Sequence, residues 1–297
     1  MSFAMYRRKF LCCAVLLMLC SLAPVGALAV SESNRVEITP NLPFASGEEL
    51  VYEGEFTKAL LRGIDIADLR FTAALEPAAA RASGASASGV SAGAGTGRSL
   101  RLTVDAVSKG LLRKLFGVRF HQHIESLVDP GSFAVLQTTK LDEQGERRRT
   151  SEAVFDRTAG KVVWTERDPN NPQREPRVIS SPFTGTVQDL ASVFYFLRTQ
   201  PLALGQSMEV TVSDSGRVYR VPHKVTERKK MKTVVGEVSV LKVEPEIFGE
   251  GRLLQGRGKM YIWFTDDARR IPVRAHISNE MGTLDIKLKS IKLGPKS

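Results

Sequence analysis

The sequence predicts a mainly β protein: a curved antiparallel sheet (half-barrel or open barrel) of roughly a dozen strands, with one short helix packed against its concave face. Three observations lead to this expectation. Apolar and polar residues alternate with a period of two through most of the chain, turn residues separate the alternating segments, and residues 189–198 follow a helical spacing instead. Period-two alternation is typical of strands with one packed face and one wet face, the usual arrangement in antiparallel sheets.

The first 29 residues precede this pattern and resemble a cleaved signal peptide. A basic start at residues 7–9, an apolar run at 11–22 and the small-residue pattern Ala27-Leu28-Ala29 follow one another in the order that such signals have. The apolar run is shorter than the about 20 residues that a membrane-spanning helix needs. We therefore expect cleavage near Ala29-Val30 and a periplasmic or secreted protein.

Two export routes fit this start. The short basic region and the apolar core favour the general secretory route. The twin-arginine route also fits, because residues 7–11 read Arg-Arg-Lys-Phe-Leu.

Cysteine and charge exclude several classes of function. All three cysteines lie before residue 30, so residues 30–297 offer no disulfide, thiol nucleophile or cysteine-based zinc site. The formal net charge of +10 includes three basic residues of the predicted signal, and the remaining excess is scattered. Nucleic-acid binding requires a concentrated basic surface, so we expect no nucleic acid among the partners.

Residues 30–297 are expected to form a single β-rich domain. Alternating apolar residues predict strands in the first half of the chain at residues 50–56, 69–75, 100–106 and 116–124. Between the second and third of these, residues 77–98 consist almost entirely of alanine, glycine and serine. Such a composition buries too little apolar surface to offset the entropy of ordering, so it predicts a disordered insertion in a hairpin.

The segment "DLASVFYFLR" at residues 189–198 is predicted to be a helix. Four apolar residues share one helical face: Leu190, Val193, Phe194 and Leu197. Thr186 and Asp189 resemble a capping box, and Pro201 ends the segment, which gives a helix of about three turns. Before and after it, further short alternating segments run to residue 293, separated by turn residues at 129–131, 214–216 and 265–268.

Three stretches resemble a family of bacterial envelope proteins catalogued as a domain of unknown function, number 3108. They are "F.SGEELVYEGEF" near the start, "DLASVFYFLRTQPL" with "LGQSMEVTVSD" in the middle, and "WFTDDARRIPVRAHI" with "GTLDIKL" near the end. The resemblance extends from about Phe44 to Leu293. It implies an exported, mainly β protein and supplies no catalytic residues. A curved sheet around a helix is also similar to the fold of periplasmic lipoprotein carriers, although fold alone does not imply function.

The aromatic helix contains the candidate ligand-binding residues. Because apolar side chains surround much of this helix, we expect it to be buried on more than one side. It either fills the core of the curved sheet, which packing alone would explain, or lines a cavity for a long apolar ligand. The candidate ligand-binding residues are Phe194, Tyr195, Phe196, Leu197 and Trp263.

Two basic runs are candidate docking surfaces for an envelope protein or an anionic membrane. We expect both runs to lie at hairpin tips, where solvated charges also suppress unwanted strand pairing. The residues are Arg147, Arg148, Arg149, Arg228, Lys229 and Lys230. His121, His123 and Glu125 could share one strand face, but no further ligand cluster accompanies them, so we expect neither a metal nor a cofactor.

The sequence favours a non-enzymatic binding or carrier protein for a lipid-like or otherwise apolar molecule. The alternative is a structural or interaction protein of the cell envelope. An enzyme is the least supported class, because no nucleophile, base and orienting group occur together in a motif.

Overall fold

The computed structural model describes residues 42–294, except 60, 78–97, 111–116 and 118. The predicted signal peptide at 1–29 lies outside the described residues, as does the predicted insertion at 77–98 apart from its two ends. Those ends, Pro77 and Arg98, are cross-strand partners in neighbouring antiparallel strands. In the part that the structure describes, no helix is both long enough and apolar enough to cross a membrane.

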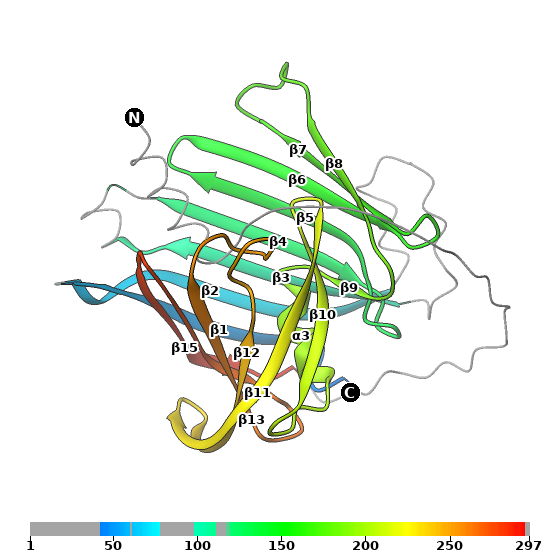
Figure 1. Cartoon of the computed structure of the whole chain (residues 1–297). Coiled ribbons are helices and arrows are strands. Elements are labelled where there is room, and N and C mark those ends of the chain that lie inside the picture. Colours follow the sequence, from blue (N-terminus) through cyan, green and yellow to red (C-terminus); the bar gives the residue numbers. More distant parts are fainter. Residues whose placement is uncertain (1–41, 60, 78–97, 111–116, 118, 295–297) are drawn as a thin grey trace, which may run out of the picture.

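The chain forms a single curled sheet of 15 strands, which confirms the predicted fold class and exceeds the predicted dozen strands (Figure 1). The strands are β1 (Glu48–Lys58), β2 (Leu61–Pro77), β3 (Arg98–Ser108), β4 (Phe120–Val128), β5 (Val135–Gln144), β6 (Arg147–Asp156), β7 (Lys161–Arg167), β8 (Arg177–Pro182), β9 (Val187–Gln188), β10 (Ser207–Asp214), β11 (Arg217–Thr233), β12 (Gly236–Pro245), β13 (Gly258–Thr265), β14 (Pro272–Asn279) and β15 (Gly282–Lys292).

The strand order places the two ends of the described chain in the middle of the sheet. From β1 the sheet continues on one side through β2 to β8, and on the other through β15, β14 and back to β10 and β9. β1 pairs with β15 along most of its length, from Glu49 opposite Lys292 to Thr57 opposite Thr283. All neighbouring strands are antiparallel except β9 and β10. The sheet edges are therefore β8 and β9.

Curling brings the two halves of the sheet together near these edges. β8 lies beside β11, and the turn between β10 and β11 packs against β7 and β8. Gly216 in this turn has φ +77°, and a Cβ atom there would lie 2.7 Å from Cβ of Trp164 and 2.9 Å from Cβ of Ile179. Glycine is thus required at this position both by the backbone and by the close approach of the opposite strands.

The predicted helix is present as α3 (Ser192–Thr199), which the curled sheet surrounds (Figure 1). It is shorter than the expected three turns, and its start is stabilised by Asp189 rather than by Thr186. The Asp189 Oδ1 accepts hydrogen bonds from the backbone N–H of Ala191 (3.0 Å) and of Ser192 (2.7 Å), and Ser192 Oγ accepts one from the N–H of Asp189 (2.9 Å). This is a capping box placed one turn later than predicted.

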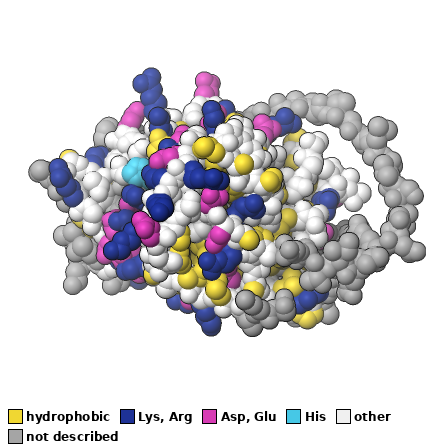
Figure 2. All heavy atoms as spheres, turned by 90° about the horizontal axis from the view of Figure 1, so that it is seen from below, with side chains coloured by type: hydrophobic (Ala, Val, Ile, Leu, Met, Phe, Trp, Pro, Cys, Tyr) yellow, Lys and Arg dark blue, Asp and Glu magenta, His cyan; other side chains and the backbone are white. Residues whose placement is uncertain are grey.

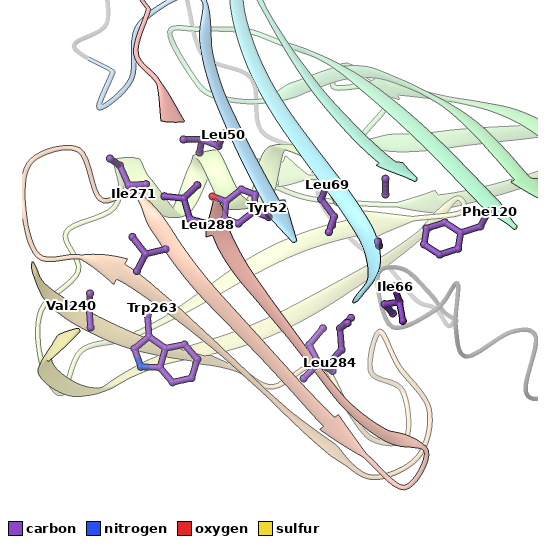
Figure 3. Packing of buried hydrophobic residues seen from close by; sticks show 14 residues of the cluster. Leu50, Tyr52, Ile66, Leu69, Phe120, Val240, Trp263, Ile271, Leu284 and Leu288 are labelled. Carbon is purple, nitrogen blue, oxygen red and sulfur yellow. The ribbon is translucent and has the colours of Figure 1, made fainter. Parts of the chain in front are cut away.

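The apolar core consists of several clusters of buried residues, which lie in different parts of the curled sheet. One cluster joins β1 and β2 to β12–β15, and includes Leu50, Tyr52 and Leu284 (Figure 3). A second cluster joins Val193 and Leu197 of α3 to the inward residues of β10–β13. A third joins Tyr195 to β2–β7. The helix contributes to the second and third clusters, so it is buried on more than one side.

Candidate functional site

An apolar cavity lies between α3 and the concave face of the sheet. Its volume is about 130 Å³. The sheet contributes lining residues from β1–β4 and from β10–β15, among them Phe71, Ile124, Val212, Ile262, Ala275 and Ile286. α3 and the loop residues Leu190, Ile247, Leu253 and Leu254 contribute the rest of the wall. The cavity is therefore bounded by residues that are far apart in the sequence.

The volume sets the scale of what the cavity can hold. An enclosed apolar cavity of about 150 Å³ lined by leucine, isoleucine and phenylalanine accommodates benzene. The present cavity is of that order, so it has room for a ring or a short piece of an acyl chain.

Three of the five predicted ligand-binding residues line the cavity: Phe194, Tyr195 and Leu197. Phe196 is not among the lining residues, and its ring packs against Phe133 with ring centroids 5.9 Å apart.

Trp263, the fifth predicted ligand-binding residue, lies on the other face of β13. Its neighbour Ile262 lines the cavity, and successive side chains on a strand point to opposite faces. Lys229 and Arg274 lie over its ring, with Lys229 Nζ 5.3 Å and Arg274 Cζ 5.2 Å from the ring centroid, and Arg274 also borders the cavity. The structure thus separates Trp263 from the aromatic residues of α3.

A buried ion pair borders the cavity at the C-terminal end of α3. Arg198 and Glu48 are each 1% exposed, and they form two hydrogen bonds, Nη1 to Oε1 at 2.5 Å and Nη2 to Oε2 at 3.0 Å. Arg198 also donates from Nε to the carbonyl of Arg269 (3.0 Å) and from Nη2 to that of Pro43 (3.2 Å). A buried pair of charges is tolerated when its hydrogen-bonding capacity is satisfied in this way.

This ion pair joins the three sequence stretches that carry the family resemblance. Glu48 belongs to the first stretch, Arg198 to the second and Arg269 to the third. Two aromatic rings cover the guanidinium, with Arg198 Cζ 5.0 Å from the ring centroid of Phe44 and 5.5 Å from that of Tyr195. The three stretches therefore meet in space at this ion pair.

Two tyrosines next to the ion pair also line the cavity. The Tyr52 hydroxyl donates to the carbonyl of Pro272 at 2.7 Å. The Tyr195 hydroxyl is buried and has no hydrogen-bond partner among the described residues. Burial raises the pKa of both hydroxyls, and the charge of Glu48 raises them further while that of Arg198 opposes the shift. Both tyrosines are neutral, so the cavity wall here carries hydroxyl groups and no net charge.

His223 is a further polar residue in the cavity wall. It is 4% exposed, and its Nδ1 lies 2.8 Å from the carbonyl of Val221, so Nδ1 carries the proton. Burial lowers the pKa of His223 to about 4, although the bond to Val221 opposes this shift. The imidazole is therefore neutral at neutral pH.

A smaller, polar pocket of about 30 Å³ adjoins the apolar cavity, because Ile124 and Leu190 line both. It lies where β10 meets β4–β7. Asp189 accepts hydrogen bonds there from the hydroxyls of Ser126 and Thr138. Burial raises the pKa of Asp214 in this pocket, and Lys140 partly offsets the shift. The described contacts at this pocket join the two halves of the sheet.

The predicted docking residues lie within strands, not at hairpin tips. Arg147, Arg148 and Arg149 begin β6, and Arg228, Lys229 and Lys230 lie opposite residues 239–241 of β12. Five of the six form ion pairs. Arg147 pairs with Asp142, Arg148 with Glu143 and Arg149 with Asp168. Arg228 pairs with Asp266 and Lys229 with Glu227. On the face seen in Figure 2, basic and acidic side chains are likewise intermixed. The charges of the first run are therefore balanced locally, and in the second run Lys230 is without an ion pair among the described residues.

His121 and His123 lie on β4 beside acidic residues. Nε2 of His121 is 2.7 Å from Asp105 and Nδ1 is 3.2 Å from Glu143. Burial lowers the pKa of His121, but these two carboxylates outweigh it and raise the pKa above its ordinary value. Within the described ranges, the acidic residues close enough together to hold a cation are a different group: Glu53, Glu55 and Asp65. Each of these three carboxylates forms an ion pair with a lysine.

Sequence reasoning missed Glu48, Arg198 and His223. A charged residue within the apolar segment 189–198 was a signal for Arg198, since buried arginine is rare unless it is paired. No signal in the sequence identified Glu48 as its partner.

A family model described as a protein of unknown function (DUF3108) matches residues 84–289, more than half of the chain. No curated protein matches. A solved structure with a similar fold is the β-barrel-like protein of domain of unknown function DUF1849 from Brucella abortus, with a TM-score of 0.52 and 11% identity over 85% of this chain and 99% of that chain.

Two further solved structures are less similar. A protein described as a lipoprotein from Parabacteroides distasonis has a TM-score of 0.29 and 10% identity, over 84% of this chain and 98% of that chain. A protein described as exported, with a YmcC-like fold, from Bacteroides fragilis has a TM-score of 0.31 and 9% identity, over 86% and 100%. These two scores are too low to support an argument, and the Brucella structure supports the fold alone.

Proposed function

This chain belongs to the DUF3108 family of proteins of unknown function, and we propose from its own geometry that it is an exported, non-enzymatic protein that binds a lipid-like or otherwise apolar ligand. The ligand occupies the space between α3 and the concave face of the sheet. Binding gains its free energy from removing apolar surface from water, at about 25 cal/mol per Å².

The apolar cavity is the observation that carries this proposal. Most of its lining residues are aliphatic or aromatic, and α3 forms one wall. Arg198 and Arg274, the charged residues in that wall, are paired with Glu48 and Asp285, and His223 is neutral, so the charges at the surface presented to a ligand are balanced. Apolar pockets with a few placed polar groups are typical ligand sites.

The amino-terminal pattern supports the export part of the proposal. Residues 7–9 are basic, residues 11–22 are apolar, and Ala27 and Ala29 match a signal-peptidase site. An exported binding protein would meet lipids of the envelope, which are apolar molecules of the class that the cavity fits. The general secretory route remains the favoured one.

The test is to produce the full chain in a bacterial host, purify the exported protein and identify its organic-extractable content by mass spectrometry. We expect a stoichiometric apolar molecule in the wild-type protein. Ala275→Leu adds bulk inside the cavity and should weaken binding by about five- to 150-fold, because overpacking a filled site costs on the order of 1–3 kcal/mol.

Ser278→Leu is the matched control, since it adds the same side chain to the opposite face of β14. It should retain the wild-type content. Repeatedly empty wild-type preparations, or equal losses in the two variants, would contradict the proposal.

A further inference from the structure

Tyr195 lines the apolar cavity, and its hydroxyl group is a donor without an acceptor among the described residues. Tyr195 is 1% exposed and lines the cavity, and its hydroxyl oxygen has no hydrogen-bond partner in the described part of the chain. Buried hydroxyl groups are nearly always hydrogen-bonded, so such an atom at a binding site calls for an explanation. The other cavity tyrosine, Tyr52, already donates to Pro272.

The charged neighbours of Tyr195 do not supply that acceptor. Both carboxylate oxygens of Glu48 accept from Arg198, and the guanidinium donates four of its five N–H groups to Glu48, Arg269 and Pro43. This end of the cavity therefore offers hydrogen-bond donors to a ligand, and its formal charges cancel.

We propose, building on the proposed function, that the apolar ligand carries a neutral hydrogen-bond acceptor, an ester or carbonyl oxygen, which accepts from the hydroxyl of Tyr195. The apolar part of the ligand lies against Phe194, Leu197 and the inward residues of the sheet. A carboxylate is disfavoured, because Glu48 already balances the charge of Arg198 and a buried anion without a free cation is costly. Acyl chains in ester linkage have this chemistry, whereas free fatty acids at neutral pH do not.

Three ring-sized probes test this inference, since the cavity is of the size that holds benzene. Methyl benzoate has the ester oxygen, propylbenzene has the same outline without it, and benzoate has a charge. Affinities are measured by isothermal titration calorimetry on the wild-type protein and on Tyr195→Phe. This substitution removes the hydroxyl oxygen and retains the ring.

We expect Tyr195→Phe to weaken methyl benzoate about tenfold, the usual effect of one lost hydrogen bond, and to change propylbenzene less than twofold. In the wild-type protein, benzoate should bind at least tenfold more weakly than methyl benzoate. This second comparison needs no variant and so does not depend on the folding of one.

Tyr52→Phe is the matched control, because its hydroxyl is used inside the protein. It should lower the melting temperature and affect the two neutral probes equally. Equal weakening of both probes by Tyr195→Phe, no weakening of either, or tight binding of benzoate would overturn the inference and leave the proposed function standing. Failure of both neutral probes to bind the wild-type protein would instead overturn the proposed function.

Discussion

The buried ion pair of Glu48 and Arg198 holds together parts of the chain that are 150 residues apart. Both side chains are almost completely removed from water, so each depends on the other for its electrostatic stabilisation. Removing one partner from such a pair leaves an isolated buried charge, which costs far more than the pair itself contributes. The pair therefore matters more for fixing the helix end against β1 than for net stability.

A double-mutant cycle tests this dependence. Glu48→Gln and Arg198→Met should each lower the free energy of unfolding by about 3–5 kcal/mol, measured in urea. The double variant should lose clearly less than the sum of the two, because it leaves no unpaired charge. Additive losses would show that the two side chains act independently.

The stability of the protein should also depend on His223. Its pKa is about 4 in the folded chain, below the ordinary value of 6.5, so between these pH values the unfolded chain binds more protons. The free energy of unfolding therefore falls as the pH drops through this window, by about 3 kcal/mol in total for this residue. Above pH 6.5 the contribution is constant.

Comparing the wild-type protein with His223→Gln isolates this contribution from the carboxylates that titrate in the same range. We expect the difference in unfolding free energy between the two proteins, from urea titrations at pH 7 and pH 4, to shrink or reverse on acidification. His276→Gln is the control for histidine substitution at a less buried site. A difference that is independent of pH would argue against a neutral, buried His223.

At the scale of elements, α3 illustrates what local sequence can and cannot specify. The helical spacing of its apolar residues predicted its existence and its buried faces. Its start was predicted one turn early, because Thr186 and Asp189 and the actual pair, Asp189 and Ser192, both fit a capping pattern. Asp189 is used because its second oxygen also accepts from the hydroxyls of Ser126 and Thr138 on β4 and β5, which no local pattern reveals.

The two alternatives for the cap can be separated by substitution. Asp189→Ala should lower the free energy of unfolding by at least 1–2 kcal/mol, since it removes the cap and leaves two buried hydroxyl groups without their acceptor. Thr186→Ala, at an exposed position, should change it by less than about 0.5 kcal/mol. Thermal denaturation followed by circular dichroism measures both changes. Similar losses of stability in the two variants would indicate that Thr186 contributes to the cap.

The strands were predictable for a different reason. Alternation with a period of two survives in β1–β4, because one face of each is packed and the other is wet, as the burial of β4 at every second residue shows. Strand pairing between sequence neighbours followed from the turns. The pairing of β1 with β15 and the parallel pairing of β9 with β10 could not be predicted, since no turn connects the partners.

For the whole molecule, the close approach at Gly216 fixes how tightly the sheet curls. The turn that contains it meets Trp164 on β7 and Ile179 on β8, so two strands near one edge pack on a hairpin from the other half. The cavity is a consequence of this curl, because its walls come from both halves. That is also why sequence reasoning found the helix wall of the site and missed Glu48 and His223.

Gly216→Ala should open this contact. Gly145 is the matched control: it occupies a hairpin turn with a similar φ of +62°, and a Cβ atom there would meet nothing within 4 Å. Both substitutions incur the cost of a positive φ, about 1 kcal/mol. Only Gly216→Ala adds a steric clash, which should cost on the order of 1–3 kcal/mol more in urea unfolding. Equal losses would contradict the packing of the two halves.

A crystal of the protein under xenon pressure tests whether an apolar cavity lies between α3 and the concave face of the sheet. Xenon enters apolar cavities of this size and is detected by its anomalous scattering. We expect a xenon atom among Phe194, Leu197 and Ala275, which is lost in Ala275→Leu and kept in Ser278→Leu. A wild-type crystal with side chains filling that space and no xenon there would contradict it.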